Sequence, residues 1–573
     1  MTVPMPKTKA RGRHRAVTKR VLGGIGIGAT MPVLWDRRTL LRAAALAPAV
    51  SLLAPMRLGA APLAGFTHSV ASGDPTRDSI VLWTRFIAAE GGETTLAVEV
   101  AEDDRFKRIA ARGTTTASPI NDHCAHARPA GLKPGRWYYY RFTAPDGSMS
   151  PVGRTRTLPA GSIESFRIGV FSCANATSGW FNAYAHAATR EDIDLIVHLG
   201  DYIYESPTDR SDAIPALAKA REIAPTGETI SLIDYRLRYA SYRADPALQE
   251  LHRRFPMITM WDDHETANNS WTNGAKNHGP EDGPWEIRKA AGIRAFREWL
   301  PMANADYASY QIGDLATMFR LETRLIGRTK QLELSEILRA GGDPRAAAEA
   351  FRKGPLADPA RTMMGAAQEQ WLRDGIARST RDGTRWQILA QQTVMAPLLL
   401  PTVKPSWYAP NVAPAPKAEA ELRFAAMLTQ MGIPEGLDRW DGYPAARDRL
   451  LGSAAQAKAN LVVLSGDSHN AWASDLVHDG KPVGVEFAGH SVSSFGIDKR
   501  FGGDPKAIAA DFTATNPLLK WCDTSRRGYM VVNLTRSAAS NEWLFLPSLT
   551  TRSTEVFDRT TFKTERRSQR LSS

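Results

Sequence analysis

Five almost uninterrupted apolar runs constrain the fold of this chain more than any other feature of its sequence. They are RIGVFS (167–172), DLIVHLG (194–200), PMITMW (256–261), RWQILAQQ (385–392) and LVVLSG (461–466). Strands that are apolar without alternation are typical of sheets buried on both faces. Helical patterns cover residues 286–300, 345–353 and 417–430. Strands alternating with helices predict an α/β fold, in a layered α/β/α arrangement, for residues 164–550.

Residues 66–158 follow a different pattern, in which short β-branched and aromatic runs are separated by Gly, Pro and Asp turns. The runs are SIVLWTRF (79–86), TTLAVEVAED (94–103) and RWYYYRFTAP (136–145). A segment of about 90 residues with such strands has the size of a small all-β sandwich domain. At the other end of the chain, residues 551–573 form a polar tail that we expect to be frayed.

The formal net charge of +12 is concentrated at the N-terminus. Residues 1–61 contain eleven Lys or Arg residues and one acid, Asp36, which leaves a charge of only +2 for the rest of the chain. A nearly balanced surface gives no indication of a nucleic-acid-binding face.

The N-terminal segment itself resembles a twin-arginine export signal. DRRTLLR (36–42) precedes the apolar run Ala43–Pro55, and small residues follow at 58–61. The apolar run is too short to cross the roughly 30 Å of a bilayer core, so we expect no stable membrane insertion of the mature chain. Met31 lies close before this signal and is the start that we expect. The segment predicts recognition by the twin-arginine export machinery and a periplasmic or extracellular location.

Residues able to bind a metal follow four of the five apolar runs. The first three runs lead to Cys173, to Asp201 and Tyr204, and to Asp262, Asp263, His264 and Asn269; the last leads to Asp467 and His469. In open α/β sheets, ligands bind outside the carboxyl ends of the strands. Unpaired buried carboxylates are costly, and bound cations remove that cost. The pattern therefore predicts a metal site at this edge of the sheet.

The donor types indicate which ions could bind there. A thiolate, a phenolate, an imidazole and carboxylates together suit a transition metal, and a trivalent ion would best keep a tyrosine ionised. Asp262 and Asn269 offer only oxygen, which suits a hard ion such as Ca²⁺ or Mg²⁺, and Asp201 could bridge two ions. Such a cluster fits metal-assisted hydrolysis, in which the ions polarise a phosphoryl group and activate a water molecule.

At these residues the sequence resembles the PhoD family of alkaline phosphatases, relatives of the purple acid phosphatases and metallophosphoesterases. The matching motifs, in the order of the family, are SVASGDPTRDSIVLWTR (69–85), FSCAN (171–175), HLGDYIYE (198–205), TMWDDHETANN (259–269), MGAAQEQWL (364–372), RWDGYPAARDRLL (439–451) and LSGDSHNAW (464–472). The resemblance spans most of residues 66–530. One departure is Glu322 in LETR (321–324), where the family often has an aspartate.

The resemblance implies a β-sandwich-like N-terminal domain, a metallophosphoesterase-type catalytic domain and a site containing iron(III) and calcium. By motif position, the predicted iron ligands are Cys173, Asp201, Tyr204 and Asp467. The candidates for the calcium side are Asp201, Asp262, Asn269 and His469. His264 resembles the histidine that related enzymes use near the leaving group, and it is predicted to bind substrate or to act as a general acid.

The function predicted from these motifs is metal-dependent hydrolysis of phosphate esters. Phosphodiesterase or phospholipase D-like activity could use the same cluster, and the segments 205–230 and 400–416, expected to be loops over the site, would decide between them. A non-catalytic protein that binds phosphate or a polymer is the alternative from another class. Its signature would be a missing ligand, and every predicted ligand position is filled.

Overall fold

The predicted apolar runs become strands in the middle of two β-sheets. The computed structural model describes residues 64–210, 213–409 and 416–573, so the predicted export signal and Met31 lie outside the described residues. The nine-stranded sheet has the order β20 (Asp558–Glu565), β19 (Ala538–Phe545), β18 (Gly528–Thr535), β8 (Ser165–Phe171), β9 (Leu195–His198), β10 (Pro256–Thr259), β1 (Gly65–Gly73), β2 (Val81–Ile87) and β5 (Cys124–Ala127). The seven-stranded sheet has the order β11 (Ala308–Ile312), β12 (Ala316–Arg320), β13 (Trp386–Ala390), β14 (Leu461–Ser465), β16 (Lys481–Ala488), β15 (Ala471–His478) and β17 (Leu519–Asp523).

Each of the two sheets contains at least three neighbouring strands that run in parallel. β8, β9 and β10 pair in parallel in the first sheet, and β12, β13 and β14 do so in the second. Because parallel neighbours run the same way, the residues that follow them collect at one edge of each sheet.

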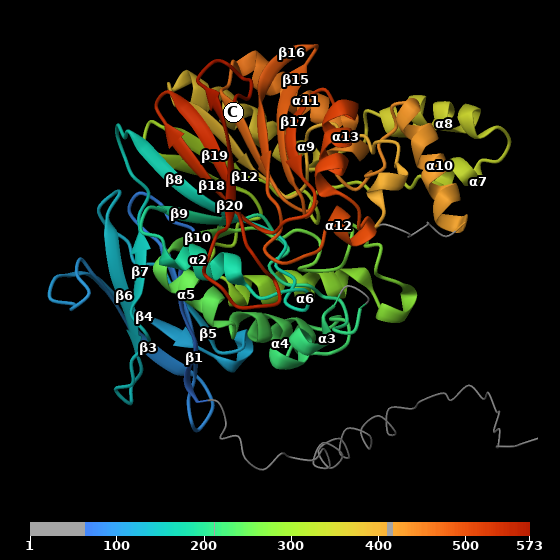
Figure 1. Cartoon of the computed structure of the whole chain (residues 1–573). Helices are drawn as coiled ribbons and strands as arrows, with labels where there is room; N and C mark the ends of the chain where they lie inside the picture. Colours follow the sequence, from blue (N-terminus) through green and yellow to red (C-terminus); the bar gives the residue numbers. More distant parts are fainter. Residues whose placement is uncertain (1–63, 211–212, 410–415) are drawn as a thin grey trace, which may run out of the picture. The chain divides into compact units, whose positions relative to one another are not determined.

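Helices lie between the strands along the chain, as the sequence predicts (Figure 1). They are α2 (Asn182–Thr189), α3 (Pro215–Ala220), α4 (Leu232–Arg243), α5 (Pro246–Arg254), α6 (Trp285–Trp299), α7 (Ser335–Arg339), α8 (Pro344–Lys353), α9 (Gly365–Arg381), α10 (Pro416–Gln430), α11 (Pro444–Ala457), α12 (Ile497–Arg500) and α13 (Pro505–Thr515). The helices α6, α8 and α10 confirm the three helical predictions. The segment 205–230, expected to be a loop, contains the short helix α3.

The two sheets pack against each other and share an apolar core. Ile168 and Val197 from the first sheet lie in one cluster with Ile388 and Val462 from the second. The outer face of the nine-stranded sheet packs against α2, α4, α5 and α6, and that of the seven-stranded sheet against α9 and α11.

The α/β class is therefore confirmed, but the layering differs from the predicted α/β/α order, because two sheets lie between the helices. A strand buried on both faces has the same apolar sequence whether its second face meets a helix or another sheet. Continuity of apolar residues could not separate these two arrangements.

Residues 66–158 form β structure in two layers. β3 (Thr94–Ala101), β4 (Ile109–Ala117), β6 (Trp137–Thr143) and β7 (Gly153–Arg156) form a separate four-stranded sheet. It packs against β1, β2 and β5 around residues such as Val70, Leu82, Val98 and Tyr140. The second layer is continuous with the nine-stranded sheet, because β1 pairs in parallel with β10.

The polar tail is ordered where we expected fraying. β20 pairs with β19 over its whole length, from Ala538–Glu565 to Phe545–Asp558. Phe562 provides the anchor, since its ring lies 6.0 Å from that of Trp521 and 6.3 Å from that of Trp543. One aromatic residue within the otherwise polar strand β20 is a weak sequence signal, although its partial burial holds an edge strand. Among the described helices, none has the length and apolar character needed to cross a membrane.

Candidate metal centre

Five of the seven predicted metal ligands have a left-handed backbone conformation. The φ angles are 58° at Cys173, 54° at Asp201, 52° at Asn269, and 60° at both Asp467 and His469. Residues other than glycine rarely adopt this region, which costs about 1–3 kcal/mol each and is concentrated at functional sites. At Cys173, Asp201 and Asp467 the left-handed residue follows within three residues of the end of its strand, so the chain turns directly after β8, β9 and β14.

Gly200 allows two of these turns to touch. It has φ +108°, and a Cβ atom at this position would lie 2.5 Å from Asp262 Cβ and 2.6 Å from Asp262 N. Only glycine tolerates both the backbone angle and the contact. The close approach brings Asp201, the next residue, beside Asp262.

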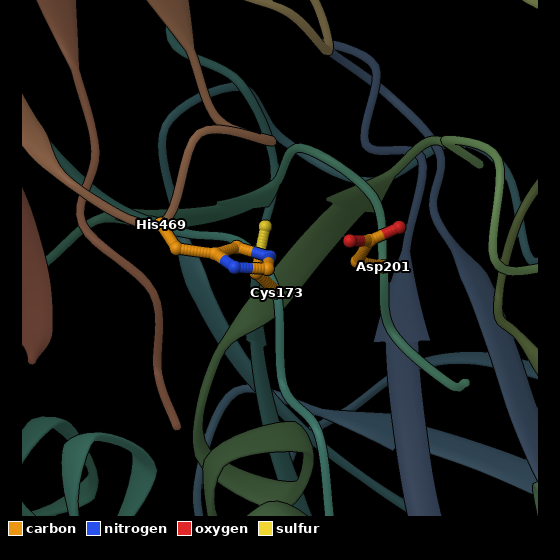
Figure 2. A group of neighbouring side chains, drawn as sticks. All are labelled: Cys173, Asp201 and His469. Carbon is orange, nitrogen blue, oxygen red and sulfur yellow. The ribbon is translucent and has the colours of Figure 1, made fainter. Parts of the chain in front are cut away.

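Cys173, Asp201 and His469 form the first group of possible ligands. Their donor atoms lie within 4.8 Å of one another, and Figure 2 shows the three side chains approaching from separate segments. The Tyr204 hydroxyl donates to Asp201 Oδ2 at 2.8 Å and lies 3.2 Å from His469 Nε2. His469 Nδ1 lies 2.6 Å from the Phe495 carbonyl oxygen, which can only accept a hydrogen bond. Nδ1 therefore carries the proton, and the lone pair of Nε2 is the one that can bind a metal.

Asp262, Asp263 and Asp467 form a second group, also within 4.8 Å of one another. The fully buried guanidinium of Arg324 lies against it. Its Nε donates to Asp262 Oδ1 at 2.5 Å, and a second nitrogen donates to Asp467 Oδ1 at 3.3 Å. A third nitrogen donates to Asp438 at 2.6 Å. Arg324 therefore holds the carboxylates in position, and it makes no hydrogen bond to Asp262 Oδ2.

Asp201, Asp263 and His264 make a third group, which joins the first two. His264 Nδ1 lies 2.6 Å from Oε2 of the buried Glu205, and the His264 ring stacks on Tyr204 with centroids 4.2 Å apart. The pKa of His264 is raised well above its ordinary value: burial lowers it, but Glu205, Asp263 and Asp201 raise it more. Asn269 is placed by its backbone, whose N–H donates to Asp263 Oδ2 at 2.7 Å.

The carboxylates of these groups have unused oxygens. Within the described residues, Asp201 Oδ1, Asp262 Oδ2 and Asp263 Oδ1 are buried and have no hydrogen-bond partner. A buried carboxylate oxygen without a partner is costly, and a bound cation is the usual remedy. The donor set therefore fits metal ions.

The pKa values of these buried groups also indicate that their charged forms need a cation. Burial raises the pKa of Asp201, against the effect of His264, and it raises the pKa of Cys173, helped by Asp201 and Asp467. Burial also raises the pKa of Tyr204 well above 10 and that of Asp467 to about 6. Protonated forms cannot bind a metal through the same lone pairs, so metal binding at this site must release protons.

The structure brings the predicted residues to one place. His469 lies in one group with Cys173 and Asp201. Asp467 lies with Asp262 and Asp263. The order of motifs along the chain cannot show such pairing, because it depends on how far each turn projects beyond the sheet.

Two residues of the site, Arg324 and Glu205, did not emerge from the sequence. Arg324 belongs to LETR, in which only Glu322 differs from the family pattern. The role of Glu322 is structural: its carboxylate accepts N–H bonds from Arg324 and Leu325 at 2.8 and 2.6 Å, which shapes the loop that carries the guanidinium. Glu205 is the last residue of GDYIYE. Its position next to the predicted ligand Tyr204 could have indicated that this acid belongs to the site.

Comparisons with known proteins agree with this geometry. A family model described as PhoD-like phosphatase matches residues 168–543, and one for the PhoD-like phosphatase N-terminal domain matches residues 57–159. Alkaline phosphatase D of Bacillus subtilis (strain 168) is 32% identical over 521 residues, which cover 87% of this chain and 80% of that protein. A solved structure described as "Structure of PhoD" is similar with a TM-score of 0.72 and 29% identity, covering 90% of this chain and 93% of that one.

The α/β fold, the cluster of possible metal ligands and the likeness to alkaline phosphatase D define a metal-dependent phosphoric ester hydrolase. The chain belongs to the PhoD-like phosphatase family, which confirms the resemblance found in its motifs.

Proposed function

We propose that this enzyme hydrolyses phosphate esters at an iron(III)–calcium centre formed by the three groups. The geometry supports Cys173, Asp201, Tyr204 and His469 as ligands of the iron, because they include the sulfur, nitrogen and phenol donors. The oxygen-only donors Asp262, Asp263, Asn269 and Asp467 suit the calcium. Asp201 lies in two of the groups and is the candidate bridge.

The single observation that carries this proposal is the set of three buried carboxylate oxygens without partners, at positions that match the family's motifs. When bound, the ions would polarise the phosphoryl group, neutralise its charge and lower the pKa of a water molecule. A protein that only captured phosphate would not need this donor set, so we favour hydrolysis over the non-catalytic alternative.

The chain's own residues complete the site. Arg324 orients Asp262 and Asp467 and offsets part of their charge. Glu205 fixes the imidazole of His264 through Nδ1, and His264 lies in one group with Asp201 and Asp263. A protonated His264 could give a proton to the oxygen of the departing alcohol, which is the role of a general acid.

A parallel assay tests the proposal. Hydrolysis of p-nitrophenyl phosphate and of bis(p-nitrophenyl) phosphate should be measured before and after treatment with a chelator. We expect the chelator to abolish hydrolysis and added iron and calcium to restore it. Rates close to background that do not respond to the chelator would contradict the proposal. The ratio of the two rates decides between monoester and diester hydrolysis.

We also propose that residues 66–158 and 164–550 act as N-terminal and catalytic domains and that the enzyme is exported. The paired arginines Arg37 and Arg38 before an apolar run support export. Replacing both by lysine, in a fusion of residues 31–62 to a folded reporter, should keep the reporter in the cytoplasm. Unchanged export would contradict the twin-arginine assignment.

A further inference from the structure

A cavity of about 220 Å³ opens beside the carboxylate cluster. Asp467 and Asp438 line one side of it, and both accept hydrogen bonds from Arg324. A substrate whose phosphate lay among the metal ligands would therefore have this space next to it. A drug-sized ligand usually occupies about 300–1,000 Å³, so this cavity suits a smaller group.

The remaining wall of the cavity combines apolar and polar side chains. The polar groups come from Glu435, Arg439, Ser468, Asn470 and Arg500. Six apolar side chains line the rest: Leu398, Leu400, Trp472, Ile497, Phe501 and Phe512. Five of them belong to one buried cluster, and Ile497, on the short helix α12, packs against that cluster. Trp472 packs edge-on against Phe512, with ring centroids 5.2 Å apart. An apolar group that entered the cavity would therefore exchange contact with water for contact with these side chains.

The charged residues of the wall are already paired. Arg500 binds Glu435 at 2.8 Å, and Asp438 binds both Arg324 and Arg328 at 2.6 Å. Arg439 lies 3.4 Å from Asp441. Each arginine that lines the cavity thus faces a carboxylate, although Arg439 Nε has no hydrogen-bond partner among the described residues. An additional anionic group would lose its hydration here and would have to compete with these carboxylates for the arginines.

We propose that this cavity binds the alcohol-derived part of the substrate, and that it selects esters whose leaving group is uncharged and mainly apolar. The fitting groups are a single aromatic ring or a short branched chain. Nucleotides with several phosphates and other polyanionic esters are disfavoured. This inference rests on the proposed function, because it assumes that the phosphate lies among the metal ligands.

Two phosphonates, which the enzyme cannot hydrolyse at the carbon–phosphorus bond, separate this inference from catalysis. Calorimetry on the metal-loaded enzyme should compare phenylphosphonate with methylphosphonate. We expect phenylphosphonate to bind at least about tenfold more tightly, because its ring would bury apolar surface in the cavity. The variant Ile497→Ser should reduce this preference several-fold and leave the affinity for methylphosphonate unchanged. Ile287→Ser is the matched control, because Ile287 is 66% exposed on α6.

Leu400→Phe provides a second variant, which fills the cavity instead of enlarging it. It should weaken phenylphosphonate binding and spare methylphosphonate. Equal affinities of the wild-type enzyme for the two phosphonates would overturn the cavity assignment alone. Equal losses for both phosphonates in both variants would do the same. If the metal-loaded enzyme bound neither phosphonate, the phosphate position itself, and with it the proposed function, would be wrong.

Discussion

Replacing Arg324 by methionine should destabilise the protein strongly, and more so without metal ions. Arg324 is fully buried and contacts Asp262, Asp438 and Asp467 at 2.5, 2.6 and 3.3 Å. Removing one partner of a buried ion pair typically costs about 3–5 kcal/mol, because the other charge stays buried without compensation. Here one substitution affects three carboxylates, so we expect a loss in the upper part of that range for the metal-free protein.

Bound cations should reduce this cost, since they neutralise the same carboxylates. The free energy of unfolding should be measured with urea and tryptophan fluorescence, for wild type and Arg324→Met, each with and without metal ions. Removal of both Arg324 and the ions should cost more than the sum of the separate losses, which is the sign of coupling between neighbours.

A surface arginine gives the matched control. Arg339 is 66% exposed and pairs with Glu333 at 3.3 Å, so Arg339→Met should have little effect. The reasoning would be refuted if Arg324→Met unfolded at the same urea concentration as wild type in the metal-free state. Strictly additive losses would show that Arg324 and the ions do not share carboxylates.

Three further substitutions test individual parts of the site. Cys173→Ala should remove iron and lower kcat more than about 100-fold with the fold intact, whereas Cys522→Ala should change neither; retained iron in the first variant would exclude the thiolate role. His264→Ala should lower kcat by about 10²–10⁴-fold and keep both metals, and loss of metal would instead make His264 a ligand. Gly200→Ala should destabilise the protein by at least about 2 kcal/mol and lower kcat, because a Cβ there meets the backbone of Asp262. Gly383→Ala, with a similar φ of +80° but open space around it, should spare kcat, and equal effects on kcat would contradict the contact argument.

Much of the α/β region could be predicted because its strands carry their own signal. Runs such as LVVLSG are apolar without interruption, and the polar residue that follows each run stands out by contrast. Five predicted ligands turned out to have left-handed backbones, which the sequence could not show. Residues such as Asp and Asn tolerate that conformation, but the same residues occur in ordinary turns.

The features that escaped prediction depend on contacts between distant segments. The division into two sheets is decided by pairings such as β1 with β10, which join residues far apart in the chain. Arg324 looks like any other arginine until the fold surrounds it with Asp262, Asp438 and Asp467. The edge strand β20 depends on the packing of Phe562 against two tryptophans. Local pattern contains no information on such long-range partners.

Elemental analysis of the purified enzyme tests the central claim most directly. The donor groups converge and leave carboxylate oxygens unsatisfied, so ions should remain bound after extensive dialysis. We expect iron and calcium at whole-number ratios to protein, and phosphatase activity that falls in proportion as a chelator removes them. Fully active enzyme that contains neither metal would contradict the account.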